Sequence, residues 1–161
     1  MTAKLQGRDE ITIAQPAGRV WPLIADSTLL SLWGPPVNAV ELIQPTAGPE
    51  GLGSRRRVDA RFGGKDGHFI EVRTEHVEGR RVAYLIEEET FGLGRVMTQP
   101  GFALEIEPAG PGRCRVTFSF FHNPKGLFGS AMNVLVILRQ QRRNRRAALA
   151  SLKQVAEDGR Y

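Results

Sequence analysis

Hydrophobic and polar residues change their spacing twice along this chain, and these changes divide it into three parts. Residues 9–14 alternate between apolar and polar side chains, which is typical of a short strand. Residues 16–26 and 26–32 then carry apolar side chains three and four positions apart, which predicts two short helices. From residue 37 to residue 120 the apolar spacing returns to two. This order indicates one strand, two short helices and then a long β region.

The β region predicts about six consecutive antiparallel strands, because short segments rich in Gly and Pro interrupt the alternation. The predicted turns include a hairpin loop at residues 63–67. The predicted strands are residues 37–43, 54–62, 68–77 and 81–89, a strand that ends near residue 106, and residues 113–120. With the first strand they make a sheet of about seven strands, and consecutive hairpins make it a meander.

The last part of the chain, Asn123 to Asp158, is rich in strong helix formers and contains no proline after Pro124. Apolar residues recur there as one stripe on a long helix. The stripe comprises Ala131, Leu135, Leu138, Leu149, Leu152 and Ala156. Arg142 and Arg145 interrupt its middle. A helix whose ends are apolar and whose middle is polar on the same side predicts a cavity beneath that middle, with exposure to solvent as the alternative.

The composition is that of an ordinary globular protein, with 41% hydrophobic and 24% charged residues. A length of 161 residues predicts a single domain, residues 1–161. A lone cysteine, Cys114, gives no sign of an oxidising compartment, so the sequence predicts a cytoplasmic protein. No apolar stretch reaches the roughly 20 residues of a membrane span. The net charge of +5 is concentrated in one arginine cluster.

Several short motifs resemble those of a known superfamily. They are Ile11 to Trp21, Asp26, the Trp33-Gly-Pro sequence, Gly51 to Arg55, and the ending Leu149 to Glu157. In this combination they resemble the SRPBCC superfamily, which includes polyketide cyclase and dehydrase-like proteins, START domains and the birch pollen allergen. The resemblance implies an α+β helix-grip fold, in which a curved antiparallel sheet wraps around the C-terminal helix. It also implies a deep hydrophobic cavity that binds a small apolar or amphipathic molecule.

Alternation along the strands predicts which side chains would line such a cavity. The inward positions are those of Phe62, His68, Tyr84, Phe102, Phe118 and Phe120. The helix stripe adds Leu135 and Leu138, and the resemblance places Trp33 at the entrance. Many aromatic side chains with few polar groups are typical of ligand sites, although the same residues would equally fill a solid core.

Candidate chemistry is limited to a few side chains. His68, His122 and Tyr84 could transfer protons, because they lie on predicted inward positions and histidine changes charge near neutral pH. Either histidine is equally explained as a rim or hairpin residue. The histidines do not have a metal-ligand spacing, so no metal and no cofactor are expected.

Arginines in the helix raise a second question. Arg142 and Arg145 could enter the cavity and pair with a carboxylate or phenolate of a ligand, or Glu88 could neutralise one of them from a strand. The alternative is a solvated helix face formed by Arg139, Arg142, Arg143 and Arg146. Which of the two holds is open from the sequence.

Three functions follow from these features. The first is binding of a small hydrophobic or amphipathic molecule, such as a lipid, polyketide-like or aromatic compound, in the cavity. The second is a cyclase or dehydratase in which His68, His122 or Tyr84 carries protons and Arg145 stabilises an enolate. The third is an interaction module that uses the basic helix. Nucleic acid is not expected as a partner, because the strands lack interleaved exposed aromatics. Peripheral membrane contact, and the choice between monomer and homodimer, stay open.

Overall fold

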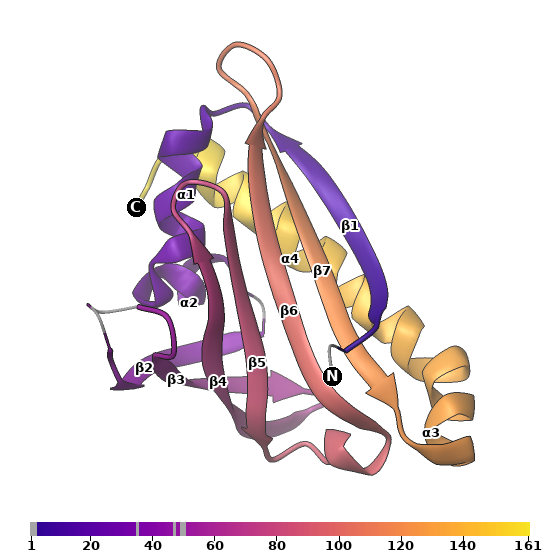
Figure 1. The fold of residues 1–161 in the computed structure, drawn as a ribbon. Helices are drawn as coiled ribbons and strands as arrows, with labels where there is room; N and C mark the ends of the chain where they lie inside the picture. The colour runs from indigo at the N-terminus through magenta and orange to yellow at the C-terminus, as the bar shows by residue number, and fades with distance from the viewer. Residues whose placement is uncertain (1–2, 35, 47, 49–50) are drawn as a thin grey trace.

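Seven antiparallel strands form one curved sheet in the computed structural model of the chain (Figure 1). The structure describes residues 3–34, 36–46, 48 and 51–161, so Pro35 of the Trp33-Gly-Pro motif lies outside it. Across the sheet the order is β1-β7-β6-β5-β4-β3-β2, so β1 pairs with β7 and the remaining neighbours follow chain order. The strands are β1 (Leu5–Ile13), β2 (Val37–Gln44), β3 (Arg55–Phe62), β4 (Lys65–Val77), β5 (Arg81–Glu89), β6 (Met97–Pro108) and β7 (Cys114–Pro124).

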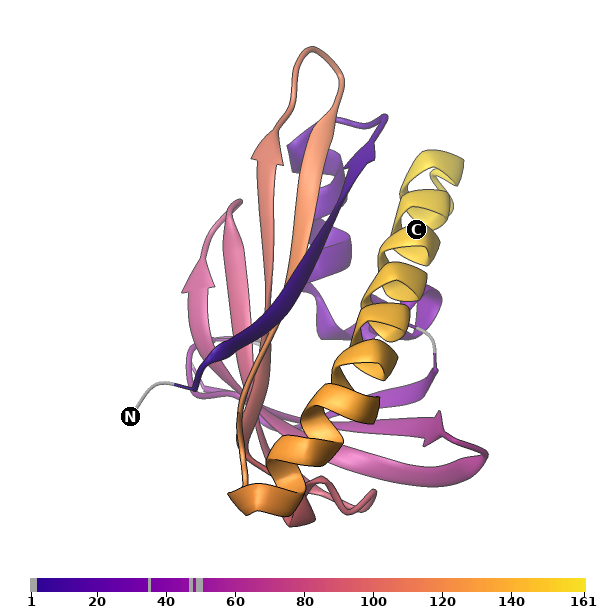
Figure 2. The ribbon, with the colours of Figure 1, turned by 90° about the vertical axis from the view of Figure 1, so that its right-hand side faces the viewer.

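Helical segments lie at three places along the chain. The long C-terminal segment crosses one side of the sheet, as Figure 2 shows, and α1 and α2 lie on that same side. The helical segments are α1 (Ala17–Ala25), η1 (Ser27–Leu29), α2 (Leu30–Trp33), η2 (Leu93–Arg95), α3 (Gly126–Met132), the π-helical turn η3 (Asn133–Ile137) and α4 (Leu138–Asp158). This arrangement confirms the predicted α+β helix-grip fold with two short helices after the first strand.

The main hydrophobic core lies where the end of α4 meets α1 and the sheet. Leu149 and Leu152 of α4 are buried there, against Val20 and Leu23 of α1. The helix stripe was therefore predicted correctly in its C-terminal half. A second, smaller cluster forms around Val58, Ala60 and Phe69 on β3 and β4. The two clusters lie apart under the same curved sheet, so the hydrophobic core is not continuous.

The N-terminal half of the C-terminal helical segment differs from the prediction. Asn123 and Pro124 still belong to β7, and the helix begins at Gly126. Gly129 and Asn133 are the buried residues of this part, whereas Leu135 is 68% exposed. A close approach explains Gly129, since a Cβ atom there would meet the carbonyl oxygen of Val96 at 2.4 Å. The predicted inward placement of Leu135 is wrong because the face that meets the sheet here carries a glycine and an asparagine.

Strand β4 faces the opposite way from the prediction. Phe69, Glu71 and Arg73 are its buried residues, and His68 lies on the outer parity. The β3–β4 hairpin sets this register: Phe62 pairs with Lys65 across a turn of only two glycines, and Val58 then faces Phe69. The predicted inward placement of His68 is wrong because two charged residues occupy the concave face and apolar residues occupy the other.

Candidate functional site

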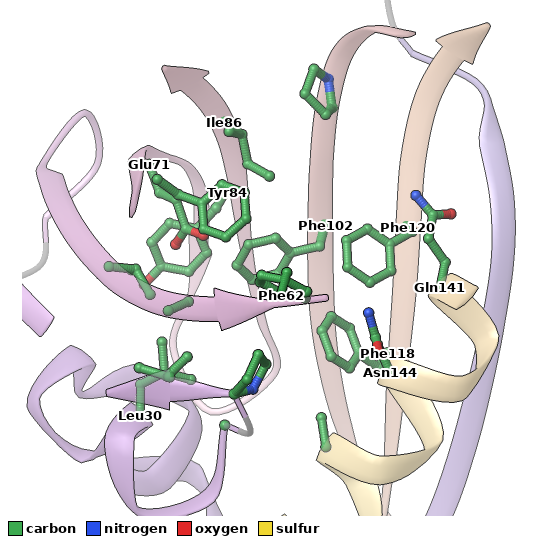
Figure 3. Close-up of a pocket in the computed structure, with 18 of the residues that line it drawn as sticks. Leu30, Phe62, Glu71, Tyr84, Ile86, Phe102, Phe118, Phe120, Gln141 and Asn144 are labelled. Atoms are coloured by element: carbon green, nitrogen blue, oxygen red, sulfur yellow. The ribbon is translucent and has the colours of Figure 1, made fainter. Parts of the chain in front are cut away.

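A cavity of about 500 Å³ lies between the two hydrophobic clusters, enclosed by the sheet and by α4 (Figure 3). Leu23 and Ala148 line it from the main core, and Val58 and Phe69 line it from the smaller cluster. Its volume falls in the range of roughly 300–1,000 Å³ that is usual for small-molecule sites. The sheet and the helix therefore enclose space rather than meeting in close contact.

Four aromatic rings from adjacent strands form one wall of the cavity. Tyr84 of β5 stacks on Phe102 of β6 with ring centroids 5.2 Å apart, and Phe118 stacks on Phe120 of β7 at 5.3 Å. Phe102 and Phe118 join the two pairs edge to face at 5.7 Å. Alternate residues on neighbouring strands point to the same face, which is why these rings meet. The wall suits flat rings or acyl chains.

A buried ion pair interrupts the apolar lining on β3 and β4. The Nε of Arg56 donates to Oε2 of Glu71 at 2.9 Å, and both side chains are about 95% buried. Arg56 also donates to the hydroxyl of Ser27 at 2.9 Å and lies over the ring of Tyr84, 3.8 Å from its centroid. A charge in so dry a place requires a close partner. Arg56 and Glu71 both line the cavity, so this pair gives it a polar wall.

A chain of hydrogen bonds leads from that polar wall to the surface. Arg73 donates from Nε to the Tyr84 hydroxyl at 3.0 Å and from Nη1 to Nδ1 of His76 at 2.8 Å. His76 in turn donates from Nε2 to Glu78, which also accepts from the Trp21 indole at 2.7 Å. These two donors hold the pKa of the Glu78 carboxyl below its usual value. The Tyr84 hydroxyl is thus held in place by a hydrogen-bond chain whose last residue, Glu78, is exposed to solvent.

The helix contributes a second polar surface. Gln141 and Asn144, one turn apart on α4, line the cavity opposite the polar wall on β3 and β4 (Figure 3). Within the described part of the chain, the buried Oε1 of Gln141 has no hydrogen-bond partner. A buried acceptor without a partner costs free energy unless a ligand or water supplies a donor. Oε1 itself has no surface open to the cavity, so a ligand would pair with it only after the Gln141 side chain turns.

His122 lies behind the cavity wall and does not line the cavity. It is fully buried; its Nε2 donates to Oδ1 of Asn133 at 2.7 Å, and its Nδ1 faces Nε2 of Gln141 at 3.4 Å. Gln6 links the same two residues: it donates to the His122 carbonyl and accepts from Asn133. Burial lowers the pKa of His122, although the bond to Asn133 opposes this effect. The ring is thus a neutral structural link between β7 and the helix.

His122 should make the stability of the protein depend on pH. Since its folded-state pKa is depressed, the unfolded chain binds a proton first as the pH falls below about 6.5. We expect the free energy of unfolding to decrease from about pH 7.5 to pH 5.5, by at most about 1.4 kcal/mol per pH unit from this one proton. His122→Gln keeps a donor and an acceptor but cannot titrate, so its profile should be flatter. Urea denaturation at each pH measures this effect.

The control for this prediction is His68→Gln, which changes a histidine on the outer face of β4. This variant should retain the pH dependence of the wild type. Equal slopes for wild type and His122→Gln would show that His122 does not supply the effect.

Arg145 is buried but does not line the cavity. Its Nε donates to Oδ2 of Asp9 on β1 at 2.9 Å, and only 4% of its side chain is exposed. The guanidinium passes over Gly7, where a Cβ atom would lie 2.7 Å from Nη2. Arg142 is exposed and does not line the cavity either. Glu88, predicted to neutralise one of these two arginines, is exposed because a bulge in the β4–β5 pairing falls between Ile86 and Glu88. The predicted role of Glu88 is therefore wrong, and Asp9 pairs with Arg145 instead.

The structure brings together part of the predicted ligand-binding set. Among the residues predicted to line the cavity, those that do so are Trp33, Phe62, Tyr84, Phe102, Phe118 and Phe120. Those outside the lining are His68, Glu88, Leu135, Leu138 and Arg145. Of the predicted proton carriers, only Tyr84 reaches the cavity, since His68 faces outward and His122 lies behind the wall. Contact of the six lining residues with a ligand stays a prediction.

Several lining residues were missed. Arg56 shares the parity of Val58 and Phe62, so continuing the β3 alternation by one step would have found it. Glu71 follows from Arg56 once the hairpin register is known. No sequence signal distinguished Gln141 and Asn144 from the solvated residues around them. Within the described residues, no group of three His, Cys, Asp or Glu side chains could hold a metal ion, and no helix has the length and apolar character to cross a bilayer.

Comparison with protein families gives a match over nearly the whole chain. The model of the family described as polyketide cyclase / dehydrase and lipid transport matches residues 4–157. No curated protein sequence matches the chain significantly.

Several solved structures are similar to this fold. The aromatase/cyclase ZhuI from Streptomyces sp. R1128 superposes with a TM-score of 0.72 at 18% identity, covering 94% of this chain and 92% of its own. A START superfamily protein from Mycobacterium smegmatis gives 0.70 at 14% identity, covering 92% and 97%. The protein Ara h 8.0201 gives 0.73 at 16% identity, covering 94% and 97%. At these identities the likeness establishes the fold.

Proposed function

Because the chain belongs to the polyketide cyclase / dehydrase and lipid transport family, within the SRPBCC superfamily, we propose that it binds a small amphipathic molecule in its internal cavity. The observation that carries this proposal is the enclosed volume of about 500 Å³ with a mostly apolar lining. A lipid, polyketide-like or aromatic compound fits such a lining. Enclosing an apolar body of this kind removes its surface from water, which favours binding by roughly 25 cal/mol per Å².

The polar groups of the lining support an amphipathic ligand over a purely apolar one. Arg56 and Glu71 present charge at one wall, and Gln141 and Asn144 contribute amide side chains to the other. A hydrocarbon would bury these polar groups without pairing with them, whereas a hydroxyl or amide of a ligand can form hydrogen bonds with them. We therefore favour a ligand with a flat or chain-like apolar body and at least one hydrogen-bonding group.

Two measurements test ligand binding. Native mass spectrometry of protein purified from its own host should show a co-purifying small molecule. Titration of delipidated protein with the fluorescent probe 1-anilinonaphthalene-8-sulfonate should give saturable enhancement with one site per chain. Absence of both a co-purifying molecule and saturable probe binding would contradict the proposal.

A second candidate is a cyclase or dehydratase acting in the same cavity. The observation that favours it is the Tyr84 hydroxyl, which accepts hydrogen bonds from Arg73 at the cavity wall. These bonds fix the position of the phenol oxygen, as proton transfer to or from a substrate requires. The set first predicted for this reaction is not assembled, because His68 and Arg145 do not line the cavity. A turnover reaction would return the bound compound with a changed mass, such as a loss of water, whereas a binding protein would return it unchanged.

We further propose that residues 1–161 act as a single ligand-binding domain in the cytoplasm, without a cofactor. The single cysteine supports this location, since Cys114 has no second cysteine in the chain with which to form a disulfide. Gel filtration coupled to light scattering would distinguish a monomer from a homodimer.

A further inference from the structure

Large apolar side chains are exposed on the first turns of the C-terminal helical segment. Leu127 is 92% exposed, Phe128 67%, Val134 70% and Leu135 68%. We call these four residues the apolar tip. They come from α3 and η3, which lie at one corner of the molecule in Figures 1 and 2. Contiguous exposed apolar residues of this kind mark contact with another apolar phase.

A basic surface follows the apolar tip on the same helical segment. Its members are Arg139, Arg142, Arg143 and Arg146, which are all exposed; we call them the arginine band. In the described part of the chain, Arg146 pairs with Asp9, and the other three have no acidic partner. Between residues 121 and 156 the sequence contains no Asp or Glu at all. The band therefore carries several positive charges that nothing nearby neutralises.

The π-turn η3 places the apolar tip and the arginine band on one face. A π-turn holds one more residue than an α-helical turn, so it rotates the helix after it by roughly 100° relative to an unbroken α-helix. With that rotation the arginines follow the tip along the same side. At about 1.5 Å per residue, Arg139 lies about 6 Å and Arg146 about 16 Å beyond Leu135 along the axis. Arg139 thus lies within the roughly 5–10 Å over which an interfacial helix is buried at the headgroup boundary, and Arg146 lies farther out.

The same end of the molecule holds the mouth of the cavity. Gln140, Lys65 and Phe91 line the cavity while remaining partly or fully exposed, so the cavity reaches the surface there. Ile137 lines the cavity one residue after the exposed Val136. Lys65 adds positive charge to this opening, and Lys125 donates to the carbonyl of Gly94, the residue after the lining residue Leu93. The tip and the mouth thus share one end of the fold, and the band extends from there to the middle of the helical segment.

From this arrangement we propose that the apolar tip and the arginine band dock the protein on an anionic lipid bilayer. The tip enters the boundary between headgroups and acyl chains, and the arginines bind lipid phosphates. A second copy of the chain is a poorer occupant, because a symmetric contact through the tip would bring two arginine bands together. The observations that support docking do not depend on the proposed ligand-binding function. Only the purpose of docking, passage of the ligand between bilayer and cavity, rests on the proposed function.

Flotation of ligand-free protein with vesicles tests docking without reference to any ligand. The protein should float with vesicles of equal parts phosphatidylcholine and phosphatidylglycerol, and far less with phosphatidylcholine alone. Binding should weaken as salt rises. Phe128→Ser with Leu135→Ser, and separately Arg142→Gln with Arg143→Gln, should each weaken binding by about tenfold or more. These side chains are exposed, so the variants should remain folded by circular dichroism.

Matched controls change the same residue types elsewhere. Arg80→Gln with Arg113→Gln removes the same charge from turns at the opposite end of the sheet, and Leu52→Ser removes an apolar side chain that is 61% exposed. Both should bind vesicles within about twofold of the wild type. An equal loss in the controls, or no preference for anionic vesicles, would overturn the proposal. A wild-type dimer that Phe128→Ser with Leu135→Ser makes monomeric, with vesicle binding unchanged, would overturn it in favour of a self-interface.

The docking proposal and the cavity-binding proposal can be tested independently. The Phe128→Ser, Leu135→Ser variant should keep the wild-type affinity for 1-anilinonaphthalene-8-sulfonate in solution, because neither residue lines the cavity. If the protein bound the probe but not vesicles, only the docking proposal would be contradicted. If it bound vesicles but not the probe, only the cavity-binding proposal would be contradicted.

Discussion

Ala148→Phe should abolish most binding of 1-anilinonaphthalene-8-sulfonate while leaving the fold intact. Ala148 lies on α4, is 5% exposed and lines the cavity, so a phenyl group there enters space that a ligand would use. We expect the affinity to fall by at least about tenfold, which is about 1.4 kcal/mol. The free energy of unfolding should change by less than about 2 kcal/mol, because the ring enters empty apolar volume rather than packed core.

The neighbouring residue offers the control. Ala147→Phe adds the same ring to an exposed position of the same helix and should leave probe affinity unchanged. Ala60→Leu on the opposite wall provides a second filling variant, should Ala148→Phe fold poorly. If both filled cavities bound the probe as tightly as the wild type, the probe site would lie elsewhere.

Glu71→Leu should destabilise the protein by about 3 kcal/mol. The change deprives the Arg56 guanidinium of its ion pair with Glu71 in a wall that is about 95% buried, and loss of one partner of a buried ion pair costs roughly 3–5 kcal/mol. Adding Arg56→Met should recover most of this loss, because the remaining wall is then apolar throughout. Urea denaturation of the three variants and the wild type measures the coupling between the two residues.

An exposed ion pair on the same hairpin serves as comparison. Arg61 and Asp66 lie 3.5 Å apart with side chains 59% and 71% exposed. Asp66→Asn should change the free energy of unfolding by less than about 0.5 kcal/mol. Equal effects for Glu71→Leu and Asp66→Asn would mean that burial does not strengthen the Arg56–Glu71 pair.

The fold could be predicted from alternation because most strands bury one apolar face. On β5 the predicted inward residue Tyr84 is buried together with Val82, which shares its parity, and on β7 Phe118 is buried with Val116. Alternation along β5, β6 and β7 also predicted the four aromatic rings that form one wall of the cavity. These strands follow the rule that apolar residues face the core.

Strand β4 was misjudged because its concave face carries charge. Placing His68 inward also placed Ile70 and Val72 inward, because they share its parity, whereas the register buries Glu71. The turn held the missing information: Gly63 and Gly64 both have positive φ, 57° and 78°, which suits a two-residue hairpin. A tight turn at those two residues pairs Phe62 with Lys65 and sets every partner that follows. Reading the loop as residues 63–67 instead lost that constraint.

The helix was misjudged for a different reason. Regular α-helical spacing places Leu135 and Arg145 on one stripe. The π-turn between them changes that spacing, and the pattern of apolar residues does not indicate it. Asn133 is buried instead of Leu135 because it satisfies His122, a partner more than ten residues away. Likewise, the buried Arg145 is explained by Asp9, from the other end of the chain. Long-range pairs of this kind are invisible to local patterns.

The two ends of the C-terminal helical segment are held in place by different numbers of buried contacts, which affects how a ligand can enter the cavity. Its last turns are fixed in the main core by Leu149 and Leu152, whereas its first turns are held by the Asn133–His122 bond and by Gly129 against Val96. Segments with few buried apolar contacts open at the lowest free energy. Local unfolding of those first turns would widen the mouth of the cavity while the rest of the protein stays folded. A ligand could then enter and leave without global unfolding.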